Sequence, residues 1–336
     1  MISEYALDPI LLAQRFAEAS YFFNNAFGVD GRILSQYPKT WTKAVWDAFN
    51  QSELGNNQIA KTKFTVLLQK LTQKHCVRRS SSYSEIPNWI ERAKREHADR
   101  PFRGILATAP PQEHAPTVPI DALWDTGDHE LWHGTTSCQP RRQNTPLAAA
   151  VAPLLRCAKH IVFVDPYFAP DKKRYTESIP EFIRSAMDKR SVAGVPRIDI
   201  VTTITDRNNN LLQGYELSSS LDWLKGECTK RIRPKIDDQI GVFLSVFLEK
   251  VGGQEIHNRY ILTEIAAIQF GKGLDCELDP ASTTCDDLTL LSYDTCQSLW
   301  EWYVSGQPKP FDVALDRYLL PDKRLQASHA DRSGPL

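Results

Sequence analysis

The sequence has no long apolar run and almost no net charge. Its longest apolar stretches, such as residues 242–248, are far shorter than the roughly 20 residues that a membrane-spanning helix needs. The first residues lack the basic start, apolar run and small-residue cleavage site of a signal peptide. Forty basic residues face 41 acidic ones, so overall charge neither favours nor excludes nucleic acid as a partner. These absences argue against membrane insertion and export.

Cysteine is also scarce, and its pattern argues against two classes of protein. The seven cysteines are an odd number, with neither the CxxC spacing of metal knuckles nor the density of a disulfide-rich secreted domain. Free thiols in a reducing cytosol are the simplest interpretation. We therefore expect a cytoplasmic protein without disulfides.

The length of 336 residues is enough for two domains. Apolar residues recur at helical spacing through the first hundred positions, which predicts a small helical domain over residues 1–106. The proline-rich stretch that follows predicts a linker over residues 107–120. An α/β domain is expected over residues 121–318, and the polar, unpatterned tail 319–336 is expected to be disordered.

Basic residues gather in the expected helical domain. From Lys61 to Arg103 there are eleven Lys or Arg against four acids. This excess has two interpretations, a solvated helix surface or a face that docks against the phosphate backbone of nucleic acid. The sequence leaves both open.

Beyond residue 120 the pattern changes to strands separated by helices. Short runs rich in β-branched and aromatic residues occupy 160–168, 197–204, 242–250, 255–263 and 266–270. Helices are expected between the first three runs. Together, the runs and helices predict a mixed or mostly parallel sheet flanked by helices. In such folds, functional groups gather at strand ends.

One expected strand carries a pair of side chains suited to phosphate chemistry. Within residues 255–263, a period of two places His257, Arg259 and Ile261 on one face. An imidazole can act as a nucleophile or proton carrier near neutral pH, and a guanidinium matches two oxygens of a phosphate group. The pair therefore indicates phosphodiester chemistry.

The segment that begins at His257 resembles the motif of the phospholipase D superfamily, His-x-Lys-x4-Asp-x6-Gly-Ser-x-Asn. The matching positions are His257 for its His, Arg259 for its Lys, Glu264 for its Asp and Gly271 for its Gly, with Lys272 and Leu274 at its Ser and Asn positions. The sequence DPYF at 165–168 and the order of strands and helices are also similar to that family. The segment is similar as well to the phospholipase D-like C-terminal domains that accompany microtubule-interacting and trafficking modules.

The resemblance implies metal-independent phosphodiester cleavage without a cofactor. In that family one motif's histidine attacks phosphorus and a second motif's histidine protonates the leaving group. Because this chain has one motif, the resemblance implies a homodimer. The protein would be a nuclease acting on DNA or RNA, and similar domains occur in bacterial defence operons. His257 would be the nucleophile, Glu264 would orient the site, and the phosphate would be held by Arg259, Gly271 and Lys272.

Departures from the motif support an alternative. Arginine in place of lysine changes the shape and reach of the cation, and glutamate in place of aspartate moves the carboxylate outward. The changes at the Ser and Asn positions remove two neutral phosphate ligands. The alternative is a catalytically inactive module that binds phosphate groups of nucleic acid, an anionic lipid or a partner protein.

A competing motif lies upstream. Residues His129 to His133 read HELWH and match the HExxH zinc signature, in which one helix presents both histidines. Gly127 and Gly134 bracket the pentapeptide and leave little room for a helix, and no third ligand follows at the usual spacing. We therefore expect an edge strand or loop here, and no metal site.

Three further residues are candidates for the phosphate cleft. Arg141 and Arg142 come before an expected helix at 146–157, whose free amides would reinforce them around an anion; solvation at the surface is the alternative. Asp165 ends the expected strand 160–168, where it either orients a catalytic partner or caps the following turn.

Overall fold

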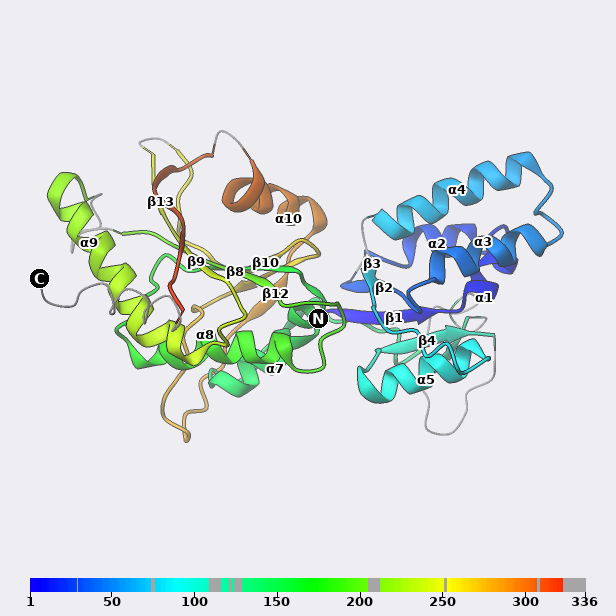
Figure 1. Cartoon of the computed structure of the whole chain (residues 1–336), viewed down its shortest axis with the longest axis horizontal. Coiled ribbons are helices and arrows are strands. Elements are labelled where there is room, and N and C mark those ends of the chain that lie inside the picture. The colour runs from blue at the N-terminus through cyan, green and yellow to red at the C-terminus, as the bar shows by residue number, and fades with distance from the viewer. Residues whose placement is uncertain are drawn as a thin grey trace, which may run out of the picture. The chain divides into compact units, whose positions relative to one another are not determined.

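The chain divides into two α/β units, each with its own sheet (Figure 1). The computed structural model describes residues 1–28, 30–73, 76–108, 116–120, 123, 129–204, 212–250, 253–306 and 309–322. Unit 1 consists of Met1–Thr136 and the short segment Lys189–Ala193. Unit 2 consists of Ser137–Asp188 and Gly194–Leu336.

Unit 1 is built on a parallel sheet of five strands in the order β3-β2-β1-β4-β5. Its elements are β1 (Ser3–Leu7), α1 (Pro9–Arg15), α2 (Ser20–Asn25), β2 (Arg32–Gln36), α3 (Trp41–Gln51), α4 (Gln58–Gln73), β3 (Cys76–Arg78), α5 (Trp89–Asp99), β4 (Gly104–Ala107) and β5 (Thr117–Pro119). In Figure 1, α3 and α4 lie on one face of the sheet and α5 on the other. The prediction of a purely helical N-terminal domain is therefore wrong.

The sequence pattern does not reveal the strands of unit 1, because they are short and buried on both faces. Every residue of β1 is buried, so its side chains show no apolar and polar alternation. Tyr5 and Leu7 face one core together with the helices α1 to α4, whereas Ala6 faces a second core with Ala93 of α5. Five such residues cannot be distinguished from part of a helix by periodicity.

The predicted linker 107–120 also needs correction, since part of it lies in the sheet. Residues 117–119 form β5, which pairs with β4 at the edge of the unit 1 sheet. Proline is tolerated on an edge strand because one side of that strand needs no hydrogen-bond donor. Residues 109–115 lie outside the described residues. Unit 1 then continues to Thr136, beyond the predicted end of the linker.

Unit 2 contains a mixed sheet of eight strands in the order β13-β9-β8-β7-β10-β11-β12-β6. Its elements are β6 (Ser137–Cys138), α7 (Asn144–Cys157), β7 (His160–Val164), α8 (Lys173–Met187), β8 (Arg197–Thr202), α9 (Gly214–Glu227), η1 (Cys228–Ile232), η2 (Arg233–Lys235), β9 (Val242–Leu248), β10 (Arg259–Thr263), β11 (Ala267–Phe270), β12 (Leu288–Leu290), α10 (Tyr293–Trp300), η3 (Glu301–Ser305) and β13 (Asp312–Leu319). Strands β7, β8 and β9 are parallel, and the other pairings are antiparallel. The predicted mixed sheet flanked by helices is confirmed.

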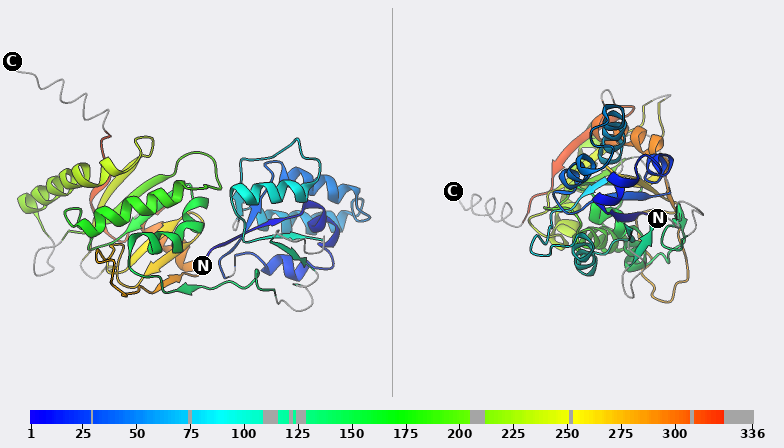
Figure 2. Two further views of the ribbon diagram at one scale, coloured as in Figure 1. Left: turned by 90° about the horizontal axis from the view of Figure 1, so that it is seen from below. Right: turned by 90° about the vertical axis from the view of Figure 1, so that its right-hand side faces the viewer.

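Helices cover both faces of this sheet. Figures 1 and 2 show α7 and α8 together on one face, where Phe182 of α8 packs against Phe163 and Phe270 of the sheet. On the other face, α10 and η3 pack over a core that includes Val164 and Phe247. Alternation along β7 therefore serves two cores at once.

The C-terminal tail begins later than predicted. Strand β13 continues to Leu319, and the next residue, Leu320, is buried and donates its backbone N–H to the carbonyl of Val242 at 2.9 Å. The remainder of the predicted tail, from residue 323, lies outside the described residues. None of the helices in the described ranges is long and apolar enough to cross a membrane. The seven cysteines all fall within those ranges, and none of them forms a disulfide bond there.

Candidate functional site

The C-terminal end of β7 and the start of β10 lie side by side at one edge of the unit 2 sheet. The antiparallel register pairs Tyr260 with Val164. Arg259, the first residue of β10, therefore falls beside Asp165, the first residue after β7. The parallel strand β8 ends at the same edge. Since functional groups gather at the carboxyl ends of parallel strands, this edge is the candidate site.

Arg259 lies at this edge with its guanidinium over an aromatic ring. Its Cζ is 4.6 Å from the ring centroid of Tyr167, a cation–π distance. The Nε atom is buried and has no hydrogen-bond partner in the described part of the chain. Tyr167 itself is 58% exposed. Arg259 as a whole is half-buried, so an arginine held by stacking can offer its outer N–H groups to an anion that arrives from solvent.

His257 lies just outside the strand. Strand β10 begins at Arg259, so the prediction that both residues project from one strand is wrong: the strand is shorter than the expected 255–263. The side chain of His257 is exposed, and within the described ranges no residue is hydrogen-bonded to its ring. The imidazole is thus accessible, and its orientation is not fixed by a described neighbour.

Asp165 is a buried connector between the end of β7 and the loop after β11. Its Oδ1 accepts the backbone N–H of Tyr167 at 2.9 Å, and its Oδ2 accepts the N–H of Leu274 at 2.9 Å and the Tyr175 hydroxyl at 3.3 Å. Burial raises the pKa of the Asp165 carboxyl, while these N–H donors and the charge of Arg259 oppose the rise. Of the two predicted roles, the structure supports the cap of the following turn.

The loop after β11 brings Lys272 to the same side of the sheet. Its tight course depends on Gly273, which has φ +140°; a Cβ there would lie 2.9 Å from Oδ1 of Asp275 and 3.4 Å from Oδ2 of Asp165. Gly271 is also close-packed, since a Cβ would lie 3.2 Å from Oδ1 of Asp286. The Lys272 side chain is exposed and has no partner among the described residues, whereas its backbone N–H donates to Oδ1 of Asp286 at 2.9 Å.

Arg142 has a structural role in place of the predicted phosphate-binding role. Its side chain is 5% exposed and donates to Asp286 Oδ2 at 2.8 Å and to Asp275 Oδ1 at 2.5 Å. The two carboxylates neutralise the guanidinium and fix the loop that carries Lys272. Arg141 points to no described partner through its side chain; it is exposed and forms a backbone bridge with Cys285.

Glu264 is not brought to the site. It follows the end of β10 that lies away from Arg259. Its carboxylate accepts two backbone N–H groups: that of Lys159, the residue before β7, at 2.6 Å, and that of His160, the first residue of β7, at 3.1 Å. Glu264 is five positions along the chain from Arg259, which is about 16 Å at the usual rise per residue of an extended strand. Glu264 therefore holds the opposite edge of the sheet and does not orient His257.

The HELWH segment belongs to unit 1 and forms a turn. The backbone N–H groups of Trp132 and His133 both donate to the carbonyl of His129, and Nδ1 of His129 accepts the N–H of Leu131. Trp132 is buried against Tyr5. The segment is a loop, as predicted, and among the described residues no group of three or more His, Cys, Asp or Glu could hold a metal ion.

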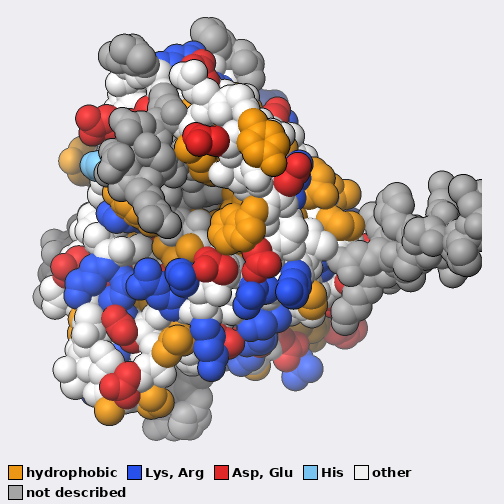
Figure 3. Space-filling view, turned by 90° about the vertical axis from the view of Figure 1, so that its left-hand side faces the viewer, with side chains coloured by type: hydrophobic (Ala, Val, Ile, Leu, Met, Phe, Trp, Pro, Cys, Tyr) orange, Lys and Arg blue, Asp and Glu red, His pale blue; other side chains and the backbone are white. Residues whose placement is uncertain are grey.

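Two features of the site were missed in the sequence. Tyr167 was quoted within DPYF without a role, and Arg174 at the start of α8 was not singled out. Arg174 is 54% exposed, with Nε 3.1 Å from Oδ2 of Asp275. Figure 3 shows further Lys and Arg side chains in a band across the face of unit 2. Besides Arg174, exposed cations next to the start of α8 are Lys172 and Lys173, and those of η1 and η2 are Lys230, Arg231 and Lys235.

The basic excess of unit 1 is largely used internally. Arg79 is fully buried between Glu4 and Glu96, and Arg100 also pairs with Glu96. Lys94 pairs with Glu91 at 2.7 Å. A run of basic residues in the sequence therefore does not form an equally basic surface.

Taken together, unit 2 places an exposed imidazole, a ring-stacked arginine and an exposed lysine on loops and strand ends at one edge of its sheet. Two of the predicted substrate ligands, Arg142 and Asp165, instead build the frame of this edge. A scan against models of protein families found no match for this chain, and a search of curated proteins found none either.

Proposed function

We propose that unit 2 is a phospholipase D-like phosphodiesterase, a metal-independent nuclease that binds its phosphodiester at the β7–β10 edge. The observation that carries the proposal is the Arg259 guanidinium, stacked on Tyr167 with a buried Nε that no described residue accepts, two residues from the exposed His257. Arginine and lysine neutralise a phosphodiester, and an accessible imidazole supplies the nucleophile.

The chemistry follows from these groups. The neutral His257 imidazole attacks phosphorus, so that a P–N bond forms as the P–O bond to the leaving group breaks. The leaving oxygen takes a proton from the His257 imidazolium of a second copy of the chain, which makes a homodimer part of the proposal. Water then breaks the P–N bond, giving up its proton to that second imidazole. Arg259 and Lys272 stabilise the charge on the phosphoryl oxygens.

A second candidate is a module that binds phosphate groups without cleaving them. The position of Glu264 favours it, since this carboxylate holds Lys159 and His160 at the other end of β10 and leaves His257 without that orienting group. Catalytic groups generally need a partner that fixes their geometry. The ligand would be a phosphate group of nucleic acid, an anionic lipid or a partner protein.

One set of measurements separates the two. Purified protein is incubated with single- and double-stranded DNA and RNA in EDTA, beside His257→Ala, Arg259→Ala and the control Lys43→Ala, an exposed cation of α3. The nuclease proposal expects EDTA-insensitive cleavage that His257→Ala abolishes while binding persists, and a dimer in sedimentation velocity. Cleavage that survives in His257→Ala rules it out.

The binding candidate expects no product, with Arg259→Ala weakening nucleic-acid or anionic-vesicle binding by about tenfold, the loss of one charge-assisted contact. The control Lys43→Ala is expected to stay within twofold, as a single exposed cation that is not part of the candidate site contributes little. Equal binding by Arg259→Ala and wild type would exclude Arg259 as the phosphate ligand in either candidate.

A further inference from the structure

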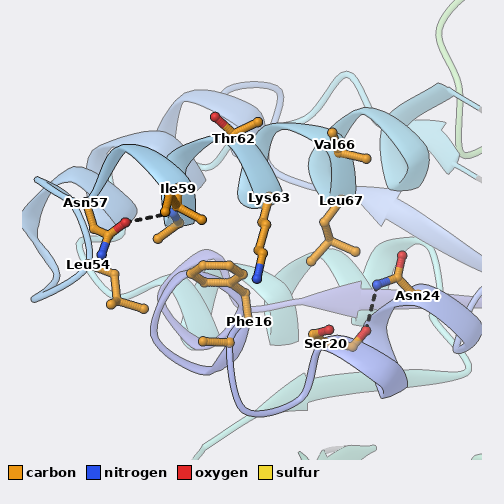
Figure 4. A pocket seen from close by; sticks show the side chains of 12 residues that line it. Phe16, Ser20, Asn24, Leu54, Asn57, Ile59, Thr62, Lys63, Val66 and Leu67 are labelled. Atoms are coloured by element: carbon orange, nitrogen blue, oxygen red, sulfur yellow. Dashed lines mark hydrogen bonds between the residues drawn. The ribbon is translucent and has the colours of Figure 1, made fainter.

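Unit 1 contains a separate hollow between α4 and the segment α1–α2 (Figure 4). Its volume is about 630 Å³, within the range of roughly 300–1,000 Å³ that small-molecule sites occupy. None of its lining residues belongs to the edge described in unit 2. The hollow is therefore independent of the proposed phosphodiesterase site.

The walls of the hollow are mainly apolar. Its inner side is formed by Phe16 and Leu67, both buried, and Phe16 is fixed edge-on against Phe64 at 4.9 Å. Ile59 and Val66 stand at its rim on α4, 70% and 61% exposed. These two residues are seven apart, so they share a helix face two turns long. Helix α4 thus presents two exposed apolar side chains on a face that does not pack into its own core.

Among the described residues that line the hollow, only Lys63 is charged, and its side chain is exposed. Lys63 extends from α4 into it, between Ile59 and Val66 and toward Phe16 (Figure 4). No acidic residue is among the lining residues, and the described part of the chain provides no ion-pair or hydrogen-bond partner for the ammonium group. The polar lining groups are largely satisfied locally: the Asn24 amide donates to Ser20, and Asn57 caps α4 at Ala60.

We propose that this hollow binds one monomeric amphiphile, an alkyl carboxylate whose chain lies against Phe16, Leu54 and Leu67 and whose carboxylate pairs with Lys63. The apolar walls gain free energy from covering an alkyl chain, and the unpaired ammonium selects a single anionic group. A nucleic-acid strand does not fit these features, because its repeated charges need several cations along a groove.

Titration calorimetry with decanoate and with decanol tests the assignment, using the full chain at concentrations below micelle formation. Wild type is expected to bind decanoate at least about tenfold more tightly than decanol, the effect of one charge-assisted contact. Lys63→Met is expected to lose this preference while retaining decanol binding. Lys61→Met, on the same helix but outside the hollow, is expected to match wild type.

A space-filling variant provides the second arm. Ala60→Trp places an indole in the hollow and is expected to abolish binding of both ligands, with circular dichroism and thermal unfolding confirming that it folds. The assignment is overturned if decanoate does not bind, if Lys63→Met keeps the preference, or if a folded Ala60→Trp binds as wild type. It is likewise overturned if phosphatidylglycerol vesicles bind in a Lys63-dependent manner but monomeric decanoate does not, since the occupant is then a membrane surface.

Discussion

At the scale of single residues, Asp165 determines the shape of the candidate site. Its two carboxylate oxygens accept one backbone N–H each, from Tyr167 and Leu274, so neither oxygen is free to serve a substrate directly. Through these contacts the aromatic ring under Arg259 and the loop bearing Lys272 are held by one side chain. The site depends on Asp165 for position and not for charge.

Replacement of Asp165 by Asn is expected to destabilise unit 2 by about 1–3 kcal/mol, because the amide nitrogen would face a buried N–H donor that it cannot accept. Urea unfolding measures the loss. Asp188→Asn is the matched control, since Asp188 is 59% exposed and pairs with Arg156 at the surface, where a salt bridge contributes about 0–1 kcal/mol. Equal stability of wild type and Asp165→Asn would contradict the connector role.

Glu4 has the corresponding place in unit 1. Burial penalises its charge, but the attraction of Arg79, at 2.7 Å, more than offsets the penalty and lowers the pKa of Glu4 below its ordinary value of 4.5. A lowered folded-state pKa stabilises the fold above pH 4.5, and that stabilisation is lost as the pH falls through the lowered pKa.

Glu4→Gln is therefore expected to cost about 3–5 kcal/mol at pH 7, the effect of removing one partner of a buried ion pair. The difference in unfolding free energy between wild type and variant should shrink as the pH falls below 4.5. Guanidinium unfolding across pH 7 to 3 measures both quantities. A difference that stays constant with pH would show that the charge of Glu4 does not contribute.

At the scale of elements, the length and the exposure of each strand decided whether the sequence predicted it. The predicted runs 160–168, 197–204 and 242–250 begin at the first residues of β7, β8 and β9, because β-branched runs bounded by turns are distinctive, but each run extends two to four residues past the end of its strand. The short, doubly buried strands of unit 1 were not found. The contacts of Asp165 with Leu274 and of Arg142 with Asp286 join residues 109 and 144 positions apart, and no local pattern encodes them. The motif grouped Glu264 with His257 and Arg259, whereas the structure places Glu264 at the other end of β10 from Arg259.

Helix α4 carries apolar side chains on two faces, and we expect the buried and the exposed ones to contribute differently to stability. Phe64→Ala is expected to cost about 3–5 kcal/mol, because Phe64 is fully buried and stacks on Phe49 at 4.3 Å. Val66→Ala, on the exposed face of the helix, is expected to change the free energy of unfolding by less than about 0.5 kcal/mol. Chemical denaturation of both variants measures the contrast. Comparable losses would mean that the rim of the hollow also supports the fold.

At the scale of the whole molecule, the chain returns to unit 1 after α8. Ser191, in the returning segment Lys189–Ala193, donates its hydroxyl to Oε2 of Glu4 at 3.0 Å, 187 positions away in the sequence. Through this contact, a segment between α8 and β8 contributes to the buried ion-pair cluster of Glu4, Arg79 and Glu96.

Ser191→Ala is expected to cost about 0.5–1.5 kcal/mol, the usual net contribution of one hydrogen bond. In the double variant with Glu4→Gln, the loss of unfolding free energy should be smaller than the sum of the two single losses, because both changes act on the same cluster. Urea unfolding of the four proteins in this cycle gives the coupling free energy. Strict additivity would show that the hydroxyl and the carboxylate act independently.

The returning segment has a consequence for biosynthesis. During synthesis, residues 1–136 leave the ribosomal exit tunnel before Ser191 does. In the interval, while α7, β7 and α8 emerge, Glu4 lacks one of its hydrogen-bond donors. Completion of unit 1 thus depends on the arrival of a later part of the same polypeptide, and nascent chains stalled before the segment 189–193 has left the tunnel should be more sensitive to protease than those stalled after it has left.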